Sequence, residues 1–245
     1  MADRRLALFD LLARGVDLPV AGAALYRLNV NGPVIGLMAR YEFSKKLSAS
    51  LNIENLADKR YYSGLGGYNG YTYVVGSFAT SGGVSTNAVA RWDGSAFNTV
   101  GSPSGANLGG NVYAATVAPD GTLYVCGTAT TYGGVAANRI AKWNGSAWSA
   151  LGTGLSGTGE SVVVGPDGSV YVTGNFSTAG GVTVNHVAKW NGSTWSALGS
   201  GTVGVAGGTG RDLKFGPDGC LYVAGTFTSA GGTTCNGIAK FDGTT

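Results

Sequence analysis

The sequence is poor in the residues from which catalytic and metal centres are most often built. Its 245 residues include one histidine and three cysteines, and only 12% of them are charged. With His186 as the single histidine, neither a Ser-His-Asp triad nor a histidine-rich metal site is expected. We therefore expect a chain that is not an enzyme, with no catalytic residue, no bound metal and no cofactor, and we predict that His186 lies in an exposed loop.

The three cysteines do not form a disulfide framework, because an odd number always leaves one unpaired. Cys220 and Cys235 are close enough in sequence to suggest a bridge. If Leu221–Phe227 and Ile238–Phe241 form a hairpin, however, Cys220 faces residue 242 and not Cys235. We expect small buried thiols, Cys126 included.

Charge is also thinly distributed, and long uninterrupted apolar runs are missing. The net charge of +3 forms no basic stripe, which argues against a nucleic-acid partner. No run of 18 apolar residues exists, so no membrane-spanning helix is expected. Asp10 and Arg14 interrupt the first apolar stretch, so it is not expected to act as a secretion signal. We predict a short helix there, with Asp3 as its N-cap and Gly15 at its end.

What the chain does contain is glycine, 44 residues of it, arranged in a repeat. A phrase beginning Gly-Ser/Thr/Asn and ending Gly-Gly starts at Gly76, Gly127, Gly174 and Gly225, at intervals of 47 or 51 residues. Each copy continues to Ala-Lys/Arg, an aromatic residue, and Asp/Asn-Gly. A period of this size indicates one supersecondary unit whose copies bury their apolar faces against one another.

Each unit contains the turn residues that separate short antiparallel strands. Pro-Asp-Gly triplets, as at Pro119–Gly121, and Trp-Asn-Gly or Trp-Asp-Gly triplets predict two hairpin turns. Runs such as Leu123–Gly127 are apolar on both faces, as in strands packed between sheets. Four strands in about 50 residues predict a β-propeller blade. The fold expected is all-β: a propeller-like array of about four repeats, preceded by a short helix and a β-hairpin.

The first and last repeats of the array are each predicted to lack one strand. The first copy shows no strand equivalent to Ser161–Gly165, and the last stops before its Ala-Leu-Gly strand. This leaves about fourteen strands, or three and a half blades, where propellers close with four to eight. We expect the chain to be part of a longer one; the alternative is four blades closed with help from the N-terminal hairpin.

Before the repeats, the chain follows a different pattern. Apolar residues alternate over Ile35–Phe43 and again over Leu47–Ile53, which predicts a hairpin with one apolar face. Residues 34–73, with Asn52–Tyr62 and Gly66–Tyr73, resemble the C-terminal strands of TonB-dependent siderophore receptors. Two or three strands cannot close a barrel, so siderophore transport is not expected. Contact with a membrane is expected only if this hairpin belongs to a barrel. We place the domain boundary between an N-terminal segment, 1–72, and a repeat domain, 73–245.

Residues 73–245 resemble the Trp-Asn-Gly-type β-propeller-like repeats of secreted bacterial and phage-associated proteins. The resemblance implies an extracellular or cell-surface location and carries no activity with it. Four loops vary most between copies while their flanks stay fixed, a pattern typical of recognition loops on a rigid frame. They are Ser85–Asn87, Val135–Asn138, Val182–Asn185 and Thr233–Asn236.

Several residues are candidates for a site. The five tryptophans are candidate ligand-binding platforms for sugars, although their position beside turns favours a wedge between blades. They are Trp92, Trp143, Trp148, Trp190 and Trp195. Glu160 and Asp212 are predicted to occupy equivalent positions in two successive repeats. They are the candidate acid–base pair. The paired glycines lack the Lys-Ser/Thr of a phosphate loop and are predicted to be turns with positive φ.

The sequence thus predicts a non-catalytic extracellular or surface-displayed scaffold that binds carbohydrate, protein or an envelope component. Its oligomeric state is left open. The alternative is a fragment of a TonB-dependent outer-membrane siderophore receptor, or a fusion or artefactual chain with no independent function.

Overall fold

The computed structural model describes the backbone of residues 23–25, 37–44, 47–53, 62–68 and 205–206, and whole residues over 71–101, 109–198 and 208–243. The chain divides into two compact units, Met1–Tyr61 and Tyr62–Thr245. The predicted N-terminal helix, with Asp3 and Gly15, lies outside the described residues. Within the described ranges, no helix is long and apolar enough to cross a membrane.

The first unit contains the predicted hairpin. Strands β1 (Ala23–Leu25), β2 (Leu37–Ser44) and β3 (Leu47–Ile53) form one antiparallel sheet in that order. The register sets Leu37 opposite Ile53, Ala39 opposite Leu51 and Tyr41 opposite Ala49. Apolar positions of both strands therefore share a face, as the alternation in the sequence predicts.

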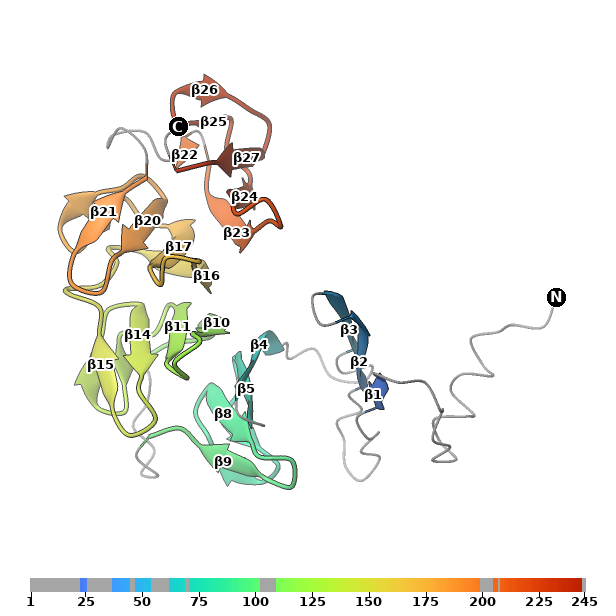
Figure 1. Cartoon of the computed structure of the whole chain (residues 1–245). Helices are drawn as coiled ribbons and strands as arrows, with labels where there is room; N and C mark the ends of the chain where they lie inside the picture. The colour runs from blue at the N-terminus through green and yellow to red at the C-terminus, as the bar shows by residue number, and fades with distance from the viewer. Residues whose placement is uncertain are drawn as a thin grey trace. The chain divides into compact units, whose positions relative to one another are not determined.

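The described part of the second unit contains four larger sheets that follow one another along the chain (Figure 1). Sheet 1 is β4 (Tyr62–Tyr68), β5 (Tyr71–Gly76), β8 (Val89–Trp92) and β9 (Phe97–Thr99); sheet 2 is β10 (Val112–Val117), β11 (Leu123–Gly127), β14 (Ile140–Trp143) and β15 (Trp148–Ala150); sheet 3 is β16 (Thr158–Val164), β17 (Val170–Asn175), β20 (Val187–Trp190) and β21 (Trp195–Ala197); sheet 4 is β23 (Gly210–Phe215), β24 (Leu221–Gly225) and β27 (Ile238–Phe241). Four antiparallel strands in spatial sequence are the predicted blade.

The first blade corrects the sequence analysis. Its innermost strand is not missing, because β4 pairs with β5 from Tyr62 opposite Gly76 to Tyr68 opposite Tyr71. Residues counted with the receptor-like segment thus complete sheet 1. For the same reason the compact units divide between Tyr61 and Tyr62, whereas the change of sequence pattern placed the boundary between residues 72 and 73.

The turns at one end of each sheet have the predicted chemistry. In sheet 2 the Gly121 N–H donates to the Ala118 carbonyl, and the Ala118 N–H donates to the Thr122 carbonyl. Asp120 accepts a hydrogen bond from the Thr122 N–H, and Gly121 has φ of 88°. This is a tight turn followed by a left-handed glycine bulge. Asn144 closes the second turn by accepting hydrogen bonds from the backbone of Ser146 and Ala147. We call this end the turn end.

The opposite end of each sheet carries a small hairpin formed around the paired glycines. These are β6 (Thr80–Ser81) with β7 (Val84–Ser85), β12 (Thr131–Tyr132) with β13 (Val135–Ala136), β18 (Thr178–Ala179) with β19 (Val182–Thr183), and β25 (Ser229–Ala230) with β26 (Thr233–Thr234) and β22 (Val205–Ala206). Gly133 and Gly134 have φ of 55° and 83°, and the other pairs match them. Both central residues have positive φ, so the predicted glycine turns are confirmed. We call this end the hairpin end.

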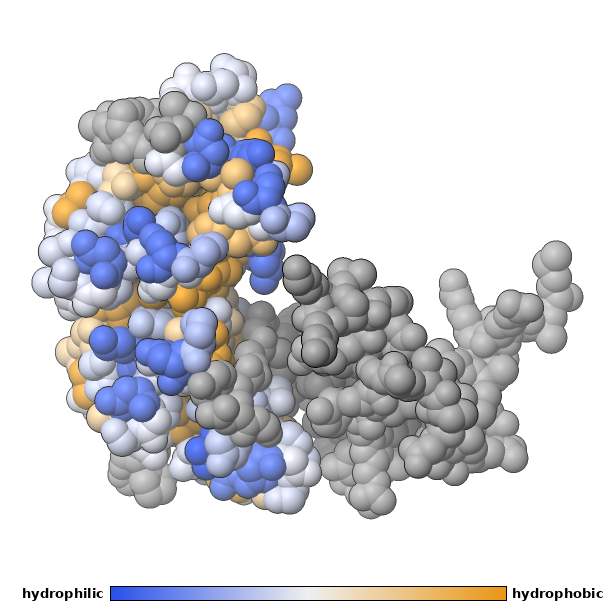
Figure 2. Space-filling model, viewed as in Figure 1, coloured by the Kyte–Doolittle hydropathy of each residue, from blue (hydrophilic) through white to orange (hydrophobic). Residues whose placement is uncertain are grey.

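Successive sheets pack face to face. Strand β10 contacts β4 on one side and β16 on the other, and β23 contacts β16. Leu123 and Val125 belong to the core between sheets 1 and 2, whereas Cys126 and Ile140 belong to the core between sheets 2 and 3. Strands apolar on both faces are therefore buried on both, as predicted. In Figure 2 apolar residues show at the seams between sheets, flanked by hydrophilic ones.

All three cysteines are free; Cys126 is buried as predicted, whereas Cys220 and Cys235 are only half-buried. Leu221 pairs with Phe241, so the register of β24 and β27 runs on to set Cys220 against residue 242, as the sequence predicts.

Candidate functional site

The tryptophans fill the seams between sheets. Trp148 and Trp195 are 7% and 6% exposed, and their indole N–H groups donate to carbonyls at the outer edge of the preceding sheet. Trp148 Nε1 lies 3.0 Å from the Val100 oxygen, and Trp195 Nε1 lies 2.8 Å from the Leu151 oxygen. Each indole therefore ties one sheet to the next.

The remaining tryptophans pack against these rings. The ring centroids of Trp143 and Trp148 are 5.5 Å apart, and Trp190 lies 5.3 Å from Trp195. Trp92, half-buried, lies 4.9 Å from Phe97. Four of the five rings are buried, which favours the wedge interpretation. Ligand binding by the five tryptophans stays a prediction.

A second feature recurs on all four innermost strands. The register slips by one residue at the same place in each: between Tyr62 and Gly64, Val112 and Ala114, Gly159 and Ser161, and Gly210 and Asp212. The extra residues are Ser63, Tyr113, Glu160 and Arg211. Bulges re-aim a side chain and are frequent next to functional sites. We call these four residues the bulge row.

The bulge row lies at the hairpin end. Strand β17 runs from the Pro-Asp-Gly turn to Asn175, where the chain enters the small hairpin. Thr158, at the start of β16, is opposite Asn175, so the bulge at Glu160 is near the same end.

Neighbouring bulges contact one another between sheets 3 and 4. Arg211 Nη1 lies 3.1 Å from Glu160 Oε1. One residue further on, the Ser161 hydroxyl donates to Asp212 Oδ1 at 2.7 Å. The sequence analysis set Glu160 and Asp212 in equivalent places; this is wrong by one residue, because the position of Glu160 is taken by Arg211 in sheet 4. Glu160 therefore forms an ion pair and is not placed as half of a carboxylate pair.

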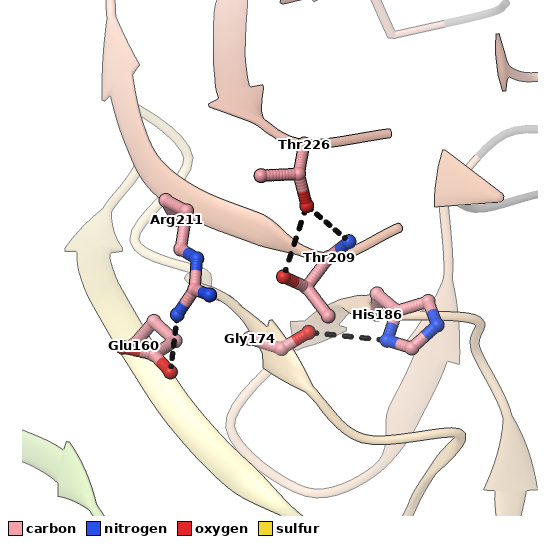
Figure 3. A network of polar contacts seen from close by, with 6 residues as sticks. All are labelled: Glu160, Gly174, His186, Thr209, Arg211 and Thr226. Atoms are coloured by element: carbon pink, nitrogen blue, oxygen red, sulfur yellow. Dashed lines mark hydrogen bonds and ion pairs between the residues drawn. The ribbon is translucent and has the colours of Figure 1, made fainter. Parts of the chain in front are cut away.

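Figure 3 draws this ion pair together with other polar contacts of sheets 3 and 4. The Thr209 N–H donates to the Thr226 hydroxyl at 3.2 Å. His186 Nδ1 lies 3.2 Å from the Gly174 oxygen. His186 stands in the loop before β20, as predicted, but it is half-buried and has φ of 73°.

The backbone bulge is the same in each sheet, whereas the residue at the bulge differs from sheet to sheet. Arg211 is 58% exposed at its side chain while one guanidinium nitrogen holds Glu160, whose side chain is 21% exposed. Further guanidinium N–H groups can donate to a ligand. Tyr113, at the same position in sheet 2, is half-buried. The three described side chains of the row therefore offer a phenol, a carboxylate and a guanidinium.

Sequence reasoning missed Tyr113 and Arg211, although a signal was present. Each stands six residues before the proline of its Pro-Asp-Gly turn, as does Glu160. Aligning the copies on that turn, and not on the paired glycines, finds the position.

The predicted recognition loops are partly inward-facing. Thr86, Ala137 and Val184 are buried, and backbone hydrogen bonds such as Val184 N–H to the Ser177 carbonyl fix each loop. Val135 and Val182, the first residues of two of these loops, face outward and are 37% and 41% exposed. Part of the sequence variation between the four loops therefore falls on residues that are buried in the core.

The turn end carries ion pairs in sheets 3 and 4. Lys189 Nζ lies 2.8 Å from Asp167 Oδ2, and Lys240 Nζ lies 2.9 Å from Asp218 Oδ2. Burial acts to raise the pKa of Asp167, but hydrogen bonds from Lys189 and the Ser169 N–H outweigh it and lower this pKa to about 2. The carboxylates of Asp167 and Asp218 are therefore paired with lysines of the same sheet. In the ranges with described side chains, no three His, Cys, Asp or Glu groups cluster as a metal site would need.

Three stretches of the chain match the family model described as "Domain of unknown function (DUF5122) beta-propeller": residues 118–145, 165–193 and 216–243. Each stretch runs from a Pro-Asp-Gly turn through the two middle strands of a sheet to the Asn-Gly or Asp-Gly of the second turn.

Other similarities are partial. The ferripyoverdine receptor of Pseudomonas aeruginosa is 48% identical over 40 residues, which are 16% of this chain and 5% of the receptor. The structure "YCF48 bound to D1 peptide" has a TM-score of 0.45 at 12% identity, covering 93% of this chain and 65% of that chain. YCF48 from Cyanidioschyzon merolae has a TM-score of 0.42 at 11% identity, covering 92% and 74%.

PorZ, described as a surface component of the type-IX secretion system of Porphyromonas gingivalis, has a TM-score of 0.37 at 12% identity, covering 91% of this chain and 41% of that chain. Three stretches of this chain are thus similar to DUF5122 β-propeller repeats, in keeping with its four-stranded sheets, and a short segment is similar to the ferripyoverdine receptor.

Proposed function

We propose that this chain is a non-catalytic binding scaffold, extracellular or displayed at the cell surface, and that the bulge row at its hairpin end holds the ligand. The observation that carries the proposal is the repeated bulge. Four inner strands keep the same backbone irregularity while its residue changes from Ser to Tyr, Glu and Arg. A conserved frame with a varied side chain suits recognition better than packing, which would keep the side chain apolar.

The chemistry of the row favours a protein segment as ligand. Tyr and Arg are the residues most enriched at protein interfaces, and both stand in the row. Arg211 is held by Glu160 and remains 58% exposed, so it is preorganised to meet a carboxylate or a main-chain carbonyl. No pair of carboxylates faces across the described part of the row, which is why we propose binding without catalysis.

Binding to an array of immobilised Asp- and Glu-rich peptides, read beside a glycan array, tests the proposal. We expect the wild-type chain to bind peptides, and Arg211→Ala and Tyr113→Ala to weaken this at least tenfold with unchanged thermal unfolding. Lys214→Ala is the matched control, since Lys214 is an exposed cation on the same strand. Equal losses for Lys214→Ala and Arg211→Ala, or binding to glycans alone, would contradict it.

A second candidate concerns the receptor-like segment, residues 34–73. The 40-residue match to the ferripyoverdine receptor favours an origin of that segment in an uptake receptor, so that the chain is a fusion or a receptor fragment. Sequencing the genomic reading frame on both sides tests this. Receptor-like sequence upstream would support it, and further propeller repeats upstream would contradict it.

A further inference from the structure

Each of the four sheets places a cation opposite a tyrosine near its turn end. The pairs are Tyr73 with Arg91, Tyr124 with Lys142, Tyr171 with Lys189, and Tyr222 with Lys240. Residues directly opposite each other lie on the same face of a sheet, with their side chains in reach of one another. The partner of the cation can therefore be compared from sheet to sheet.

In sheets 3 and 4 the aspartate of the Pro-Asp-Gly turn completes the pair. Asp167 Oδ2 lies 2.8 Å from Lys189 Nζ and accepts a hydrogen bond from the Tyr171 hydroxyl at 3.4 Å. Asp218 Oδ2 has the same two partners in sheet 4, at 2.9 and 2.8 Å. One carboxylate oxygen therefore meets a cation and a phenol at the same time.

Sheet 1 keeps the cation and the phenol but has no aspartate in this turn. Residues 69 and 70, which join β4 to β5, are Asn and Gly. Within the described ranges Arg91 forms no ion pair, and its Nε is buried without a hydrogen-bond partner. The Tyr71 ring lies against the guanidinium, with Arg91 Cζ 4.6 Å from the ring centroid. A ring face offsets positive charge but leaves the guanidinium N–H donors without acceptors.

The guanidinium is held between a buried side and an open side. Arg91 shares its face of sheet 1 with Val75 and Val89, which belong to the core between sheets 1 and 2. Tyr73 is 6% exposed, whereas Tyr71, at the start of β5, is 39% exposed. A planar guanidinium fixed against an aromatic ring is suited to bidentate binding of a carboxylate. A ligand can therefore approach from the side of Tyr71.

We propose that Arg91, Tyr71 and Tyr73 bind the carboxylate of an aspartate that another protein presents. This carboxylate takes the place that Asp167 has in sheet 3: it accepts hydrogen bonds from the Arg91 guanidinium and from the Tyr73 hydroxyl. The guanidinium can donate two parallel N–H groups to it, which a lysine ammonium cannot. An aspartate is favoured over a phosphate because the same pair of side-chain types, cation and tyrosine, holds an aspartate twice within this chain.

This site is independent of the proposed function. Arg91 lies at the turn end, beside the Trp-Asp-Gly turn that begins at Trp92, whereas the bulge row lies at the hairpin end. Either can therefore fail alone, and Arg211→Ala should leave binding at Arg91 unchanged.

The probe is a labelled peptide with the sequence of residues 165–169, Gly-Pro-Asp-Gly-Ser, blocked at both ends. Its binding to the full chain is measured by fluorescence anisotropy, and the Nε–H resonance of Arg91, followed by NMR, locates the bound peptide. We expect saturable binding that shifts this resonance. A peptide with Asn in place of Asp should bind about tenfold more weakly, because it lacks the charge.

Variants of the protein assign the contacts. Arg91→Lys keeps the charge but loses the bidentate fork, and it should weaken binding about fivefold or more with unchanged thermal unfolding. Tyr73→Phe keeps the ring but loses the hydroxyl, and it should weaken binding about threefold or more. Lys142→Met is the matched control, since it changes the cation of sheet 2, where the turn has Asp120, and the affinity should stay within about twofold of wild type.

Equal affinity of the Asp and Asn peptides would overturn the proposal, as would an Arg91 resonance that the peptide does not shift, or equal losses for Arg91→Lys and Lys142→Met. Acetate or inorganic phosphate that binds at Arg91 as tightly as the peptide would show an anion site without a protein partner, and would also overturn it. A shift of the resonance with protein concentration alone would do the same, by showing that a second copy occupies the site. Because the two peptides are compared on the wild-type chain, a failure of Arg91→Lys to fold leaves the proposal testable.

Discussion

At the residue scale, the tryptophan that begins the fourth strand of sheets 2 and 3 is held by a hydrogen bond to the preceding sheet. Trp195 shows this most clearly, with its indole N–H on the Leu151 carbonyl and its ring on the turn at Gly180. The sequence predicted that such tryptophans wedge between blades. It did not predict the acceptor, because Leu151 lies 44 positions away and is brought near only by the stacking of sheets.

Trp195→Phe should keep most of the packing and lose the indole hydrogen bond, while the Leu151 carbonyl keeps the Gly154 N–H as a donor. We expect a loss of about 0.5–1.5 kcal/mol in the free energy of unfolding, measured by urea titration. Ser196→Ala, at an exposed neighbour, should change it by less than about 0.5 kcal/mol and serves as the control. Equal effects would show that the indole contact contributes nothing.

Asp167 gives stability that depends on pH. Its pKa is 3.8 without the fold and about 2 in it, so its ion pair with Lys189 stabilises the protein above pH 3.8 and is lost as pH falls toward 2. Asp167→Asn keeps the turn hydrogen bond to the Ser169 N–H. We expect the wild-type advantage over this variant, measured as the urea midpoint, to shrink from pH 6 to pH 2. Lys189→Met should show the same loss of pH dependence; a constant gap across this range would refute the prediction.

At the element scale, glycine serves the small hairpins through backbone conformation in all four sheets and through space where an aromatic ring lies against the turn, as at Gly133 and Gly180. Positive φ is common to all four pairs, and the sequence predicted it from the glycines alone. The lack of space is a tertiary effect, because it comes from the ring of the fourth strand and differs between sheets.

Gly180→Ala and Gly231→Ala separate these two reasons. Their φ values are 58° and 56°, so both should lose about 1–2 kcal/mol of unfolding free energy from backbone strain. Gly180→Ala also forces the Trp195 ring to move, which should cost about 1–3 kcal/mol more. Chemical denaturation of the two variants measures the difference; equal destabilisation would mean that the ring adjusts freely.

At the scale of the whole molecule, stability comes from pairs of neighbouring sheets. Each inner sheet is covered on both faces, and the same repeat position is buried or exposed according to its place in the array. Ile140 and Val187 are 0% and 3% exposed, whereas Ile238 is 67% exposed. Repeat arrays are stabilised by such nearest-neighbour interfaces.

Ile140→Ser should therefore cost about 3 kcal/mol or more, because it places a hydroxyl in the core between sheets 2 and 3. Ile238→Ser should change the unfolding free energy by less than about 0.5 kcal/mol. Thermal and urea unfolding of the two variants compare them directly. A large cost for Ile238→Ser would show that sheet 4 is covered in solution.

The boundary of the repeat unit is tested by truncation. A fragment of residues 62–245 keeps β4, and a fragment of residues 73–245 removes it together with the first residues of β5. We expect the shorter fragment to unfold at a lower temperature by circular dichroism, since sheet 1 loses its innermost strand and its contacts with β10. Equal melting temperatures would place the boundary at residue 73 after all.

The sequence by itself determined the repeat, the turns and the strands, because φ preferences, Asp and Asn capping and alternation are local properties of a few residues. It also determined the receptor-like hairpin, whose apolar alternation gives its register. Only the tertiary structure decided that Tyr62–Tyr68 joins sheet 1, since pairing with β5 depends on which strand lies beside it. Likewise, the stacking of sheets decided that Glu160 meets Arg211 and not Asp212. A one-residue bulge shifts every later position on a strand, and its effect becomes visible only when two bulged strands lie side by side.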